Sequence, residues 1–186
     1  VCYEVTEDQL KEAQNSHTKK KEAGGSYGTT VHKIAEQWVK RCITENNGLA
    51  VPFTEQEQPI QKLVEWSVAN KIKFLESEKQ FYSKSLFCAG TCDVIFEKDG
   101  KKYLGDFKTQ KKIWSREPLL QMAGYIYMAE EMGAEQFDGS VILHMPESGE
   151  FNEIWSFDRD GDRKGFLAAV ELYRTMQDFK LDKVKE

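Results

Sequence analysis

The apolar residues of the chain follow two periodicities, one typical of helices and one typical of strands. Apolar side chains recur every three or four residues in four segments, which predicts amphipathic helices at about 30–44, 59–77 and 118–132 and a last helix that starts at Asp160 or Asp162. Segments rich in β-branched and aromatic residues predict strands at 80–83, within 90–109, at 140–145 and at 151–157. This order predicts a single α/β domain over residues 1–186.

Two of the helices carry further detail. Thr54 and Glu57 have the spacing of a capping box, and Pro59 follows in the first turn of the second helix. Residues 1–27 are a polar N-terminal segment. The last helix is expected to pack on the core through an apolar stripe, which consists of Phe166, Ala169, Val170, Tyr173 and Met176.

The stretch 90–109 predicts a tight β-hairpin around which the rest of the chain is organised. Asp99 and Gly100 suit a two-residue type I′ turn, in which both residues need a positive φ. If these two residues form the turn, strand pairing places Asp93 opposite Asp106. Side chains alternate along a strand, so Lys108 shares the face of Asp106.

Two carboxylates facing each other across a hairpin repel one another. A divalent cation between Asp93 and Asp106 would remove that repulsion, and Lys108 would then meet a phosphate or a polarised water. The alternative is an ordinary solvated hairpin face, and a register slip of one residue would break the arrangement. The hairpin alone leaves both interpretations open.

Two further pairs of polar residues lie four positions apart on predicted helices. His32 and Glu36 sit at the edge of an apolar stripe, where a histidine is either a partly buried structural side chain or a metal ligand. Gln121 and Tyr125 form a separate polar stripe on the third helix. The alternative to a functional role is that Tyr125 is a half-buried packing residue and that Gln121 faces solvent.

The distribution of charge and the cysteine content indicate what the protein binds and in which setting it works. The chain carries a net charge of −5, but residues 98–116 contain seven basic and two acidic side chains, among them Lys111 and Lys112. Such a local patch binds phosphates despite an acidic total, although a solvated loop is the common alternative. No apolar run approaches the roughly 20 residues of a membrane helix, so no membrane association is expected. The four cysteines lack disulfide-framework spacing, which favours a reducing, cytoplasmic setting.

Taken together, these motifs resemble the RecB-like exonuclease branch of the PD-(D/E)XK nuclease superfamily. A short D-x-K alone is weak, but five elements in this order and at these intervals are a strong signal. The resemblance covers most of the chain, from about Gly28 to Tyr127. Its elements are Gly28–His32 with Glu36, then Glu78, Gly90–Asp93, Asp106–Thr109 and Gln121–Tyr125.

The resemblance implies a restriction-endonuclease-like core, which is a central mixed β-sheet flanked by helices. It implies that Mg²⁺ or Mn²⁺ is bound by Asp93, Asp106, the backbone carbonyl of Phe107 and His32. By the same resemblance Lys108 is the catalytic lysine. It also implies that Gln121 and Tyr125 lie near the DNA backbone, with Glu36 and Glu78 as supporting residues.

The implied activity is metal-dependent hydrolysis at single- or double-stranded DNA ends in recombination or repair. An endonuclease of the same superfamily and a silent DNA-binding or assembly module are the alternatives. Many members of this branch hold an iron–sulfur cluster with cysteines near the C-terminus, whereas no cysteine follows Cys92, so we expect no iron–sulfur cluster. Whether the protein forms a homo-oligomer or acts with a recombination partner protein stays open. The first residue is Val1 rather than Met, so it also stays open whether the chain is part of a longer protein.

Overall fold

The computed structural model describes residues 27–134 and 136–178, so most of the polar N-terminal segment predicted at residues 1–27 lies outside the described residues. The described chain begins within a helix at residues 27–45, which extends the predicted helix by one turn at its N-terminal side. The elements that follow are η1 (Glu55–Ile60), α2 (Gln61–Ala69), β1 (Lys73–Ser83), β2 (Cys88–Lys98), β3 (Lys101–Lys108), α3 (Glu117–Glu131), β4 (Gly139–His144), β5 (Asn152–Ser156) and α4 (Arg159–Asp178).

The five strands form one mixed sheet in the order β1-β2-β3-β4-β5. Neighbouring strands are antiparallel except for β3 and β4, which are parallel because α3 connects them across one face. The predicted hairpin is confirmed, with Ile95 opposite Leu104. Asp99 and Gly100 have φ values of 53° and 73°, as a type I′ turn requires.

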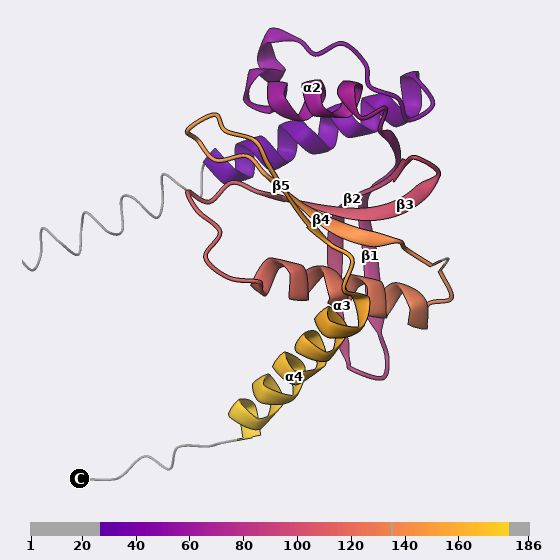
Figure 1. The fold of residues 1–186 in the computed structure, drawn as a ribbon, viewed down its shortest axis with the longest axis vertical. Coiled ribbons are helices and arrows are strands. Elements are labelled where there is room, and N and C mark those ends of the chain that lie inside the picture. Colours follow the sequence, from indigo (N-terminus) through magenta and orange to yellow (C-terminus); the bar gives the residue numbers. More distant parts are fainter. Residues whose placement is uncertain (1–26, 135, 179–186) are drawn as a thin grey trace, which may run out of the picture.

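Helices cover both faces of the sheet (Figure 1). The helix at residues 27–45 and α2 cover one face, where Trp38, Phe74 and Phe96 are fully buried. On the other face α3 packs Met122 and Ala129 against Leu104 and Ile142. Each strand of the central hairpin is therefore buried on both sides, which fixes the position of its ends. The predicted α/β fold with a central mixed sheet is confirmed.

The prediction of the second helix, to about residue 77, is wrong at its C-terminal end. The helix α2 stops at Ala69, and Leu75 lies in β1 instead of in the helix. The chain reverses at Asn70 and at Lys71, which has a φ of 52°. Glu78, expected just before a short strand, is consequently inside the 11-residue strand β1.

The last helix also differs from the prediction. It starts at Arg159, and the carboxylate of Asp158 accepts a hydrogen bond from the N–H of Gly161, so neither Asp160 nor Asp162 is the cap. Tyr173 and Met176, expected in the core, are 64% and 66% exposed. The reason is that the C-terminal half of α4 runs beyond the body of the protein (Figure 1).

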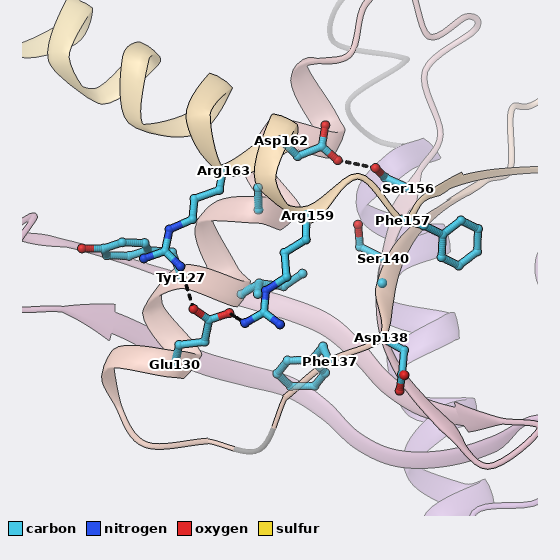
Figure 2. Close-up of a pocket in the computed structure, with 13 residues that line it drawn as sticks. Tyr127, Glu130, Phe137, Asp138, Ser140, Ser156, Phe157, Arg159, Asp162 and Arg163 are labelled. Carbon is cyan, nitrogen blue, oxygen red and sulfur yellow. Dashed lines mark hydrogen bonds and ion pairs between the residues drawn. The ribbon is translucent and has the colours of Figure 1, made fainter.

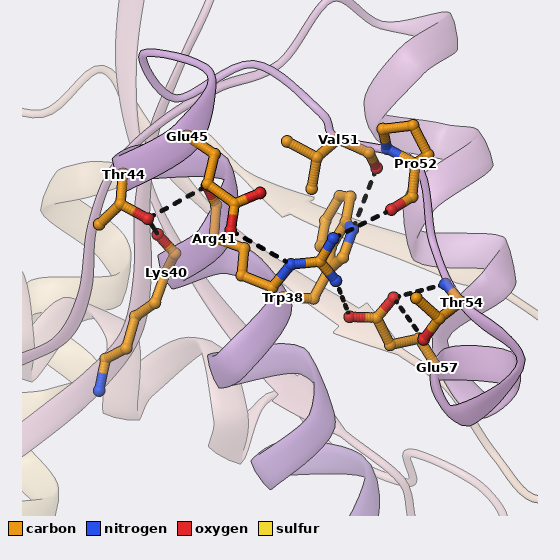
Figure 3. Close-up of polar contacts among 9 residues, drawn as sticks. All are labelled: Trp38, Lys40, Arg41, Thr44, Glu45, Val51, Pro52, Thr54 and Glu57. Atoms are coloured by element: carbon orange, nitrogen blue, oxygen red, sulfur yellow. Dashed lines mark hydrogen bonds and ion pairs between the residues drawn. The ribbon is translucent and has the colours of Figure 1, made fainter.

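A polar network ties the helix at residues 27–45 to η1 (Figure 3). Arg41 pairs with Glu57, whose other oxygen accepts a 2.6 Å hydrogen bond from the backbone N–H of Thr54. The predicted capping box is thereby confirmed. Nearby, Nε1 of Trp38 donates to the carbonyl of Val51 at 3.2 Å. These contacts hold in place the helix that carries His32.

Across the described ranges, no helix combines the length and the apolar character that crossing a membrane requires.

Candidate active site

The predicted site residues gather where β3 ends. Asp106 and Lys108 lie two residues apart at the end of β3, and Nζ of Lys108 is 2.6 Å from Oδ2 of Asp106. The side chain of Asp106 is only 4% exposed and that of Lys108 is 21% exposed. A buried carboxylate and a partly accessible ammonium group are thus presented together.

Asp93 reaches the same place from β2, but by a different geometry from the one expected. Regular pairing of β2 with β3 extends only to Val94 and Gly105, so Asp93 and Asp106 are not a pair of the ladder. Instead, Oδ2 of Asp93 accepts a 2.7 Å hydrogen bond from the backbone N–H of Phe107.

An irregularity of β2 explains this difference. Cys92 and Val94, two residues apart, pack into clusters on opposite faces of the sheet, which a regularly alternating strand does not allow. On the neighbouring strand, Glu78 has a φ of 54°. The local distortion therefore spans both strands and turns Asp93 toward the end of β3.

His32 approaches from the helix at residues 27–45. Its Nδ1 lies 3.6 Å from Oδ2 of Asp93, and its ring makes an edge contact with Phe107 at a centroid distance of 6.0 Å. The imidazole is 37% exposed. Burial lowers the pKa of His32, although the charge of Asp106 opposes that shift. The ring is therefore neutral at pH 7 and has a lone pair for a cation or a proton.

A chain of hydrogen bonds joins Lys108 to α3. Nζ of Lys108 donates to Oε1 of Gln121 at 3.2 Å, and Nε2 of Gln121 donates to the hydroxyl of Tyr125 at 2.8 Å. The ring of Tyr125 is buried, and burial raises its pKa to about 12. The phenol thus keeps its proton and fixes Gln121, which in turn orients the ammonium group of Lys108.

The two carboxylates have raised pKa values. Burial is the largest cause of the shift for Asp93, and the charge of Asp106 adds to it, which raises the pKa of Asp93 to about 7. Burial also raises the pKa of Asp106, although Lys108 opposes the shift. One lysine does not compensate two buried carboxylates, so the site favours a further positive charge.

Two further acids, Glu36 and Glu78, were predicted to support the site. Glu36 forms an ion pair with Lys40 one turn along its helix rather than with His32. Burial raises the pKa of Glu78, and the charges of Glu36 and Asp106 contribute to that shift. Glu78 is therefore close enough to Asp93 and Asp106 to interact with them electrostatically, and its charge adds to the raised pKa of Asp93.

Lys111 and Lys112 lie in the exposed loop between β3 and α3. Nζ of Lys112 lies 4.3 Å from the ring centroid of Trp114. The sequence pattern assigned no role to Trp114. Its exposure of 82%, which no sequence pattern indicates, makes it the additional residue of interest here.

The donors present are those a hard divalent cation prefers. Within the described part of the chain, no three His, Cys, Asp or Glu side chains enclose a cation by themselves. Oδ2 of Asp106 is nevertheless buried and has no hydrogen-bond donor of regular geometry among the described residues, despite its ion pair with Lys108. Carboxylate oxygens such as those of Asp93 and Asp106 are the ligands that a hard divalent cation prefers.

A separate pocket lies away from this site, between α3, α4 and the strands β4 and β5 (Figure 2). Glu130 pairs there with Arg159 and, at 2.9 Å, with Arg163. The guanidinium of Arg163 lies 4.7 Å from the ring centroid of Tyr127. None of the candidate active-site residues lines this pocket, and its arginines are already paired.

Comparisons with known proteins find a similar fold among solved structures but no match by sequence. A search of family models and a search of curated proteins by sequence both find no match. The fold is similar to the crystal structure named "Putative exonuclease" from Eubacterium rectale, with a TM-score of 0.51 and 12% identity, over 83% of this chain and 64% of that chain. The chain thus spans slightly less than two thirds of that protein. The crystal structure of SSO0001 matches with a TM-score of 0.34 and 11% identity, over 76% of this chain and 74% of that one.

Proposed function

We propose that the protein is a divalent-metal-dependent deoxyribonuclease that hydrolyses phosphodiester bonds from DNA ends, in recombination or repair. The observation that supports this most is the pair of buried carboxylates with raised pKa values, Asp93 and Asp106, beside Lys108 at the end of β3. The fold similarity to the "Putative exonuclease" from Eubacterium rectale agrees with a nuclease.

The carboxylates and their neighbours would hold the metal ion. Asp93, Asp106 and the carbonyl of Phe107 supply oxygen ligands, and the neutral ring of His32 faces the same place. When bound, Mg²⁺ or Mn²⁺ would lower the pKa of a coordinated water and neutralise charge on the phosphate. Placing the ion between two carboxylates would also relieve their repulsion.

Lys108 would act on the reacting phosphate or water. Its Nζ is held between Asp106 and Gln121, at 2.6 Å and 3.2 Å, so the ammonium group is oriented before substrate binds. A pre-oriented charge stabilises the developing negative charge of the transition state at little reorganisation cost. The amide of Gln121, fixed by Tyr125, would bind the DNA backbone nearby, and Lys111 and Lys112 would bind further phosphates.

Cleavage of end-labelled linear single- and double-stranded DNA, beside a covalently closed circle, tests the proposal. We expect Mn²⁺-dependent loss of the linear species alone, and no loss with Lys108→Ala. Cutting of the circle would instead establish an endonuclease. Equal activity of wild type and variant would contradict the site assignment, and DNA binding without metal-dependent cleavage would support a silent binding module.

A further inference from the structure

An exposed tryptophan marks the loop that leaves the candidate active site. This loop connects β3 with α3, and Trp114 lies in it six residues beyond Lys108. The side chain is 82% exposed, whereas Trp38 is fully buried and Trp66 is 6% exposed. Nζ of Lys112 lies over the Trp114 ring at 4.3 Å from its centroid. A large exposed ring beside a cation suits a planar, negatively charged partner.

An apolar pocket adjoins the ring. It has a volume of about 330 Å³ and opens to solvent. Ligand pockets in proteins begin at about 300 Å³, so this space accommodates a planar ring. The residues that form its apolar lining are Ile113, Trp114, Pro118, Leu119, Ile142 and Ile154.

The charge of the loop complements a nucleic acid backbone. From 107 to 116 the chain has four basic side chains and no acidic one. Lys108 pairs with Asp106, and Arg116 pairs with Asp162 at 2.7 Å. Lys111 and Lys112 form no ion pair with the described part of the chain, so their charges are available to phosphates.

The loop is anchored to the site at both ends. At its start, the N–H of Met145 donates to the carbonyl of Lys108 at 2.7 Å, and Nε2 of His144 contacts the carbonyl of Gln110 at 2.6 Å. At its end, the loop enters α3, which carries Gln121. A strand whose phosphate lies at Lys108 therefore meets this loop next.

We propose that Trp114 and the adjoining pocket bind an unpaired nucleobase of the DNA strand by stacking, which makes the protein selective for single-stranded or frayed ends. Bases inside a duplex are already stacked on one another, so only an unpaired base gains this contact. The inference rests on the proposed function, because the phosphate at Lys108 is what brings the strand to the loop.

Binding of a short labelled oligothymidylate, compared with an abasic strand of equal length, tests this inference in EDTA, which prevents cleavage. We expect Trp114→Ala to weaken oligothymidylate binding roughly 5- to 150-fold, the range for loss of one stacked base, without affecting the abasic strand. Trp114→Phe should bind like wild type because it keeps an aromatic ring. The matched control is Phe87→Ala, which removes an aromatic that is 96% exposed in the turn between β1 and β2.

Unchanged oligothymidylate affinity in Trp114→Ala would overturn the inference and leave Trp114 as a contact for a protein partner. Equal wild-type affinity for the abasic strand would also overturn it. If the wild type still degrades linear DNA with Mn²⁺ in either case, the proposed function stands on its own. A wild type that neither binds nor cleaves DNA would overturn both.

Discussion

The backbone N–H of Phe107 donates a hydrogen bond to Oδ2 of Asp93, with an N···O distance of 2.7 Å. This contact lies beyond Val94 and Gly105, the last regular pair of β2 and β3. It satisfies one oxygen of Asp93, yet burial and the charge of Asp106 still raise the pKa of Asp93 to about 7. The fold therefore holds the carboxyl group of Asp93 in a place that disfavours its charged form.

We predict that, without divalent metal, the contribution of Asp93 to stability declines as the pH rises. The pKa of Asp93 is 3.8 ordinarily and about 7 in the folded protein, so between these values the folded state binds more protons than the unfolded state. Unfolding free energy must then fall with increasing pH across that window. Thermal unfolding in EDTA measures this. Asp93→Asn should flatten the slope, and Mn²⁺ should raise Tm more at pH 7 than at low pH.

The matched control is Asp99→Asn in the hairpin turn, because the Asp99 side chain is 80% exposed. Asparagine tolerates the positive φ of that position. Its pH profile should coincide with that of wild type. A slope in Asp93→Asn as steep as that of wild type would show that other groups cause the pH dependence.

Lys108 is predicted to act in catalysis. Lys108→Ala should lower kcat by about 10²–10³-fold, the usual cost of removing one pre-oriented stabilising group. Tm should fall in EDTA, because the variant leaves the buried carboxylate of Asp106 without its counter-charge. Lys101→Ala, at the turn end of the same strand, is the control. Steady-state cleavage of linear DNA measures both, and equal losses in the two variants would argue for a general charge effect.

His32 is predicted to contribute to metal binding. His32→Gln should raise the Mn²⁺ concentration for half-maximal cleavage by at least about 10-fold, since loss of even an outer-sphere partner of a metal ligand costs about that much. Glu45→Gln serves as the control, because Glu45 is an exposed residue at the other end of the same helix and pairs with Arg41. Metal titrations of both variants at saturating DNA would decide. A normal Mn²⁺ requirement in His32→Gln would make His32 a structural residue.

The hairpin was predictable because its signals are local. Asp99-Gly100 dictates a turn of two residues, and that turn fixes the register as far as Val94 and Gly105. The position of Asp93 was not predictable in detail, since the irregularity depends on packing of Cys92 and Val94 into different clusters. Sequence spacing thus selected the residues of the candidate site, and tertiary packing set their geometry.

The boundary between α2 and β1 was missed for a related reason. The chain turns at Asn70 and Lys71 without a glycine or proline, and the end of the helix is marked only by its C-cap Asn70, a weaker stop signal than glycine. The exposed half of α4 was missed because the apolar spacing of Tyr173 and Met176 is that of a packed face. Periodicity shows which face of a helix is apolar, but not where its neighbour ends.

The ion pair between Arg41 and Glu57 gives a prediction on stability (Figure 3). Glu57→Ala should reduce the unfolding free energy by about 1–3 kcal/mol, because it leaves the partners of a nearly buried carboxylate unsatisfied. Glu55→Ala, at an exposed position of the same short helix, should have little effect. Urea unfolding of both variants measures the difference, and similar values would show that the network contributes no stability.

Gly90 is predicted to be required for stability and activity because its backbone packs against the ring of Tyr125. A Cβ atom at this position would lie 2.6 Å from Cε1 of Tyr125, which is too close for the buried ring to stay in place. The ring carries the hydroxyl that fixes Gln121, so Gly90→Ala should disturb the chain that leads to Lys108. We expect a lower kcat and a loss of about 1–3 kcal/mol in stability.

A double-mutant cycle separates this steric effect from any other role of Gly90. In a Tyr125→Ala background the added methyl group meets no ring, so Gly90→Ala should cost much less stability there than in wild type. Tyr125→Phe keeps the ring and removes only the hydroxyl, and in that background the cost of Gly90→Ala should return. Equal costs in all three backgrounds would mean that the backbone, and not the ring, requires glycine.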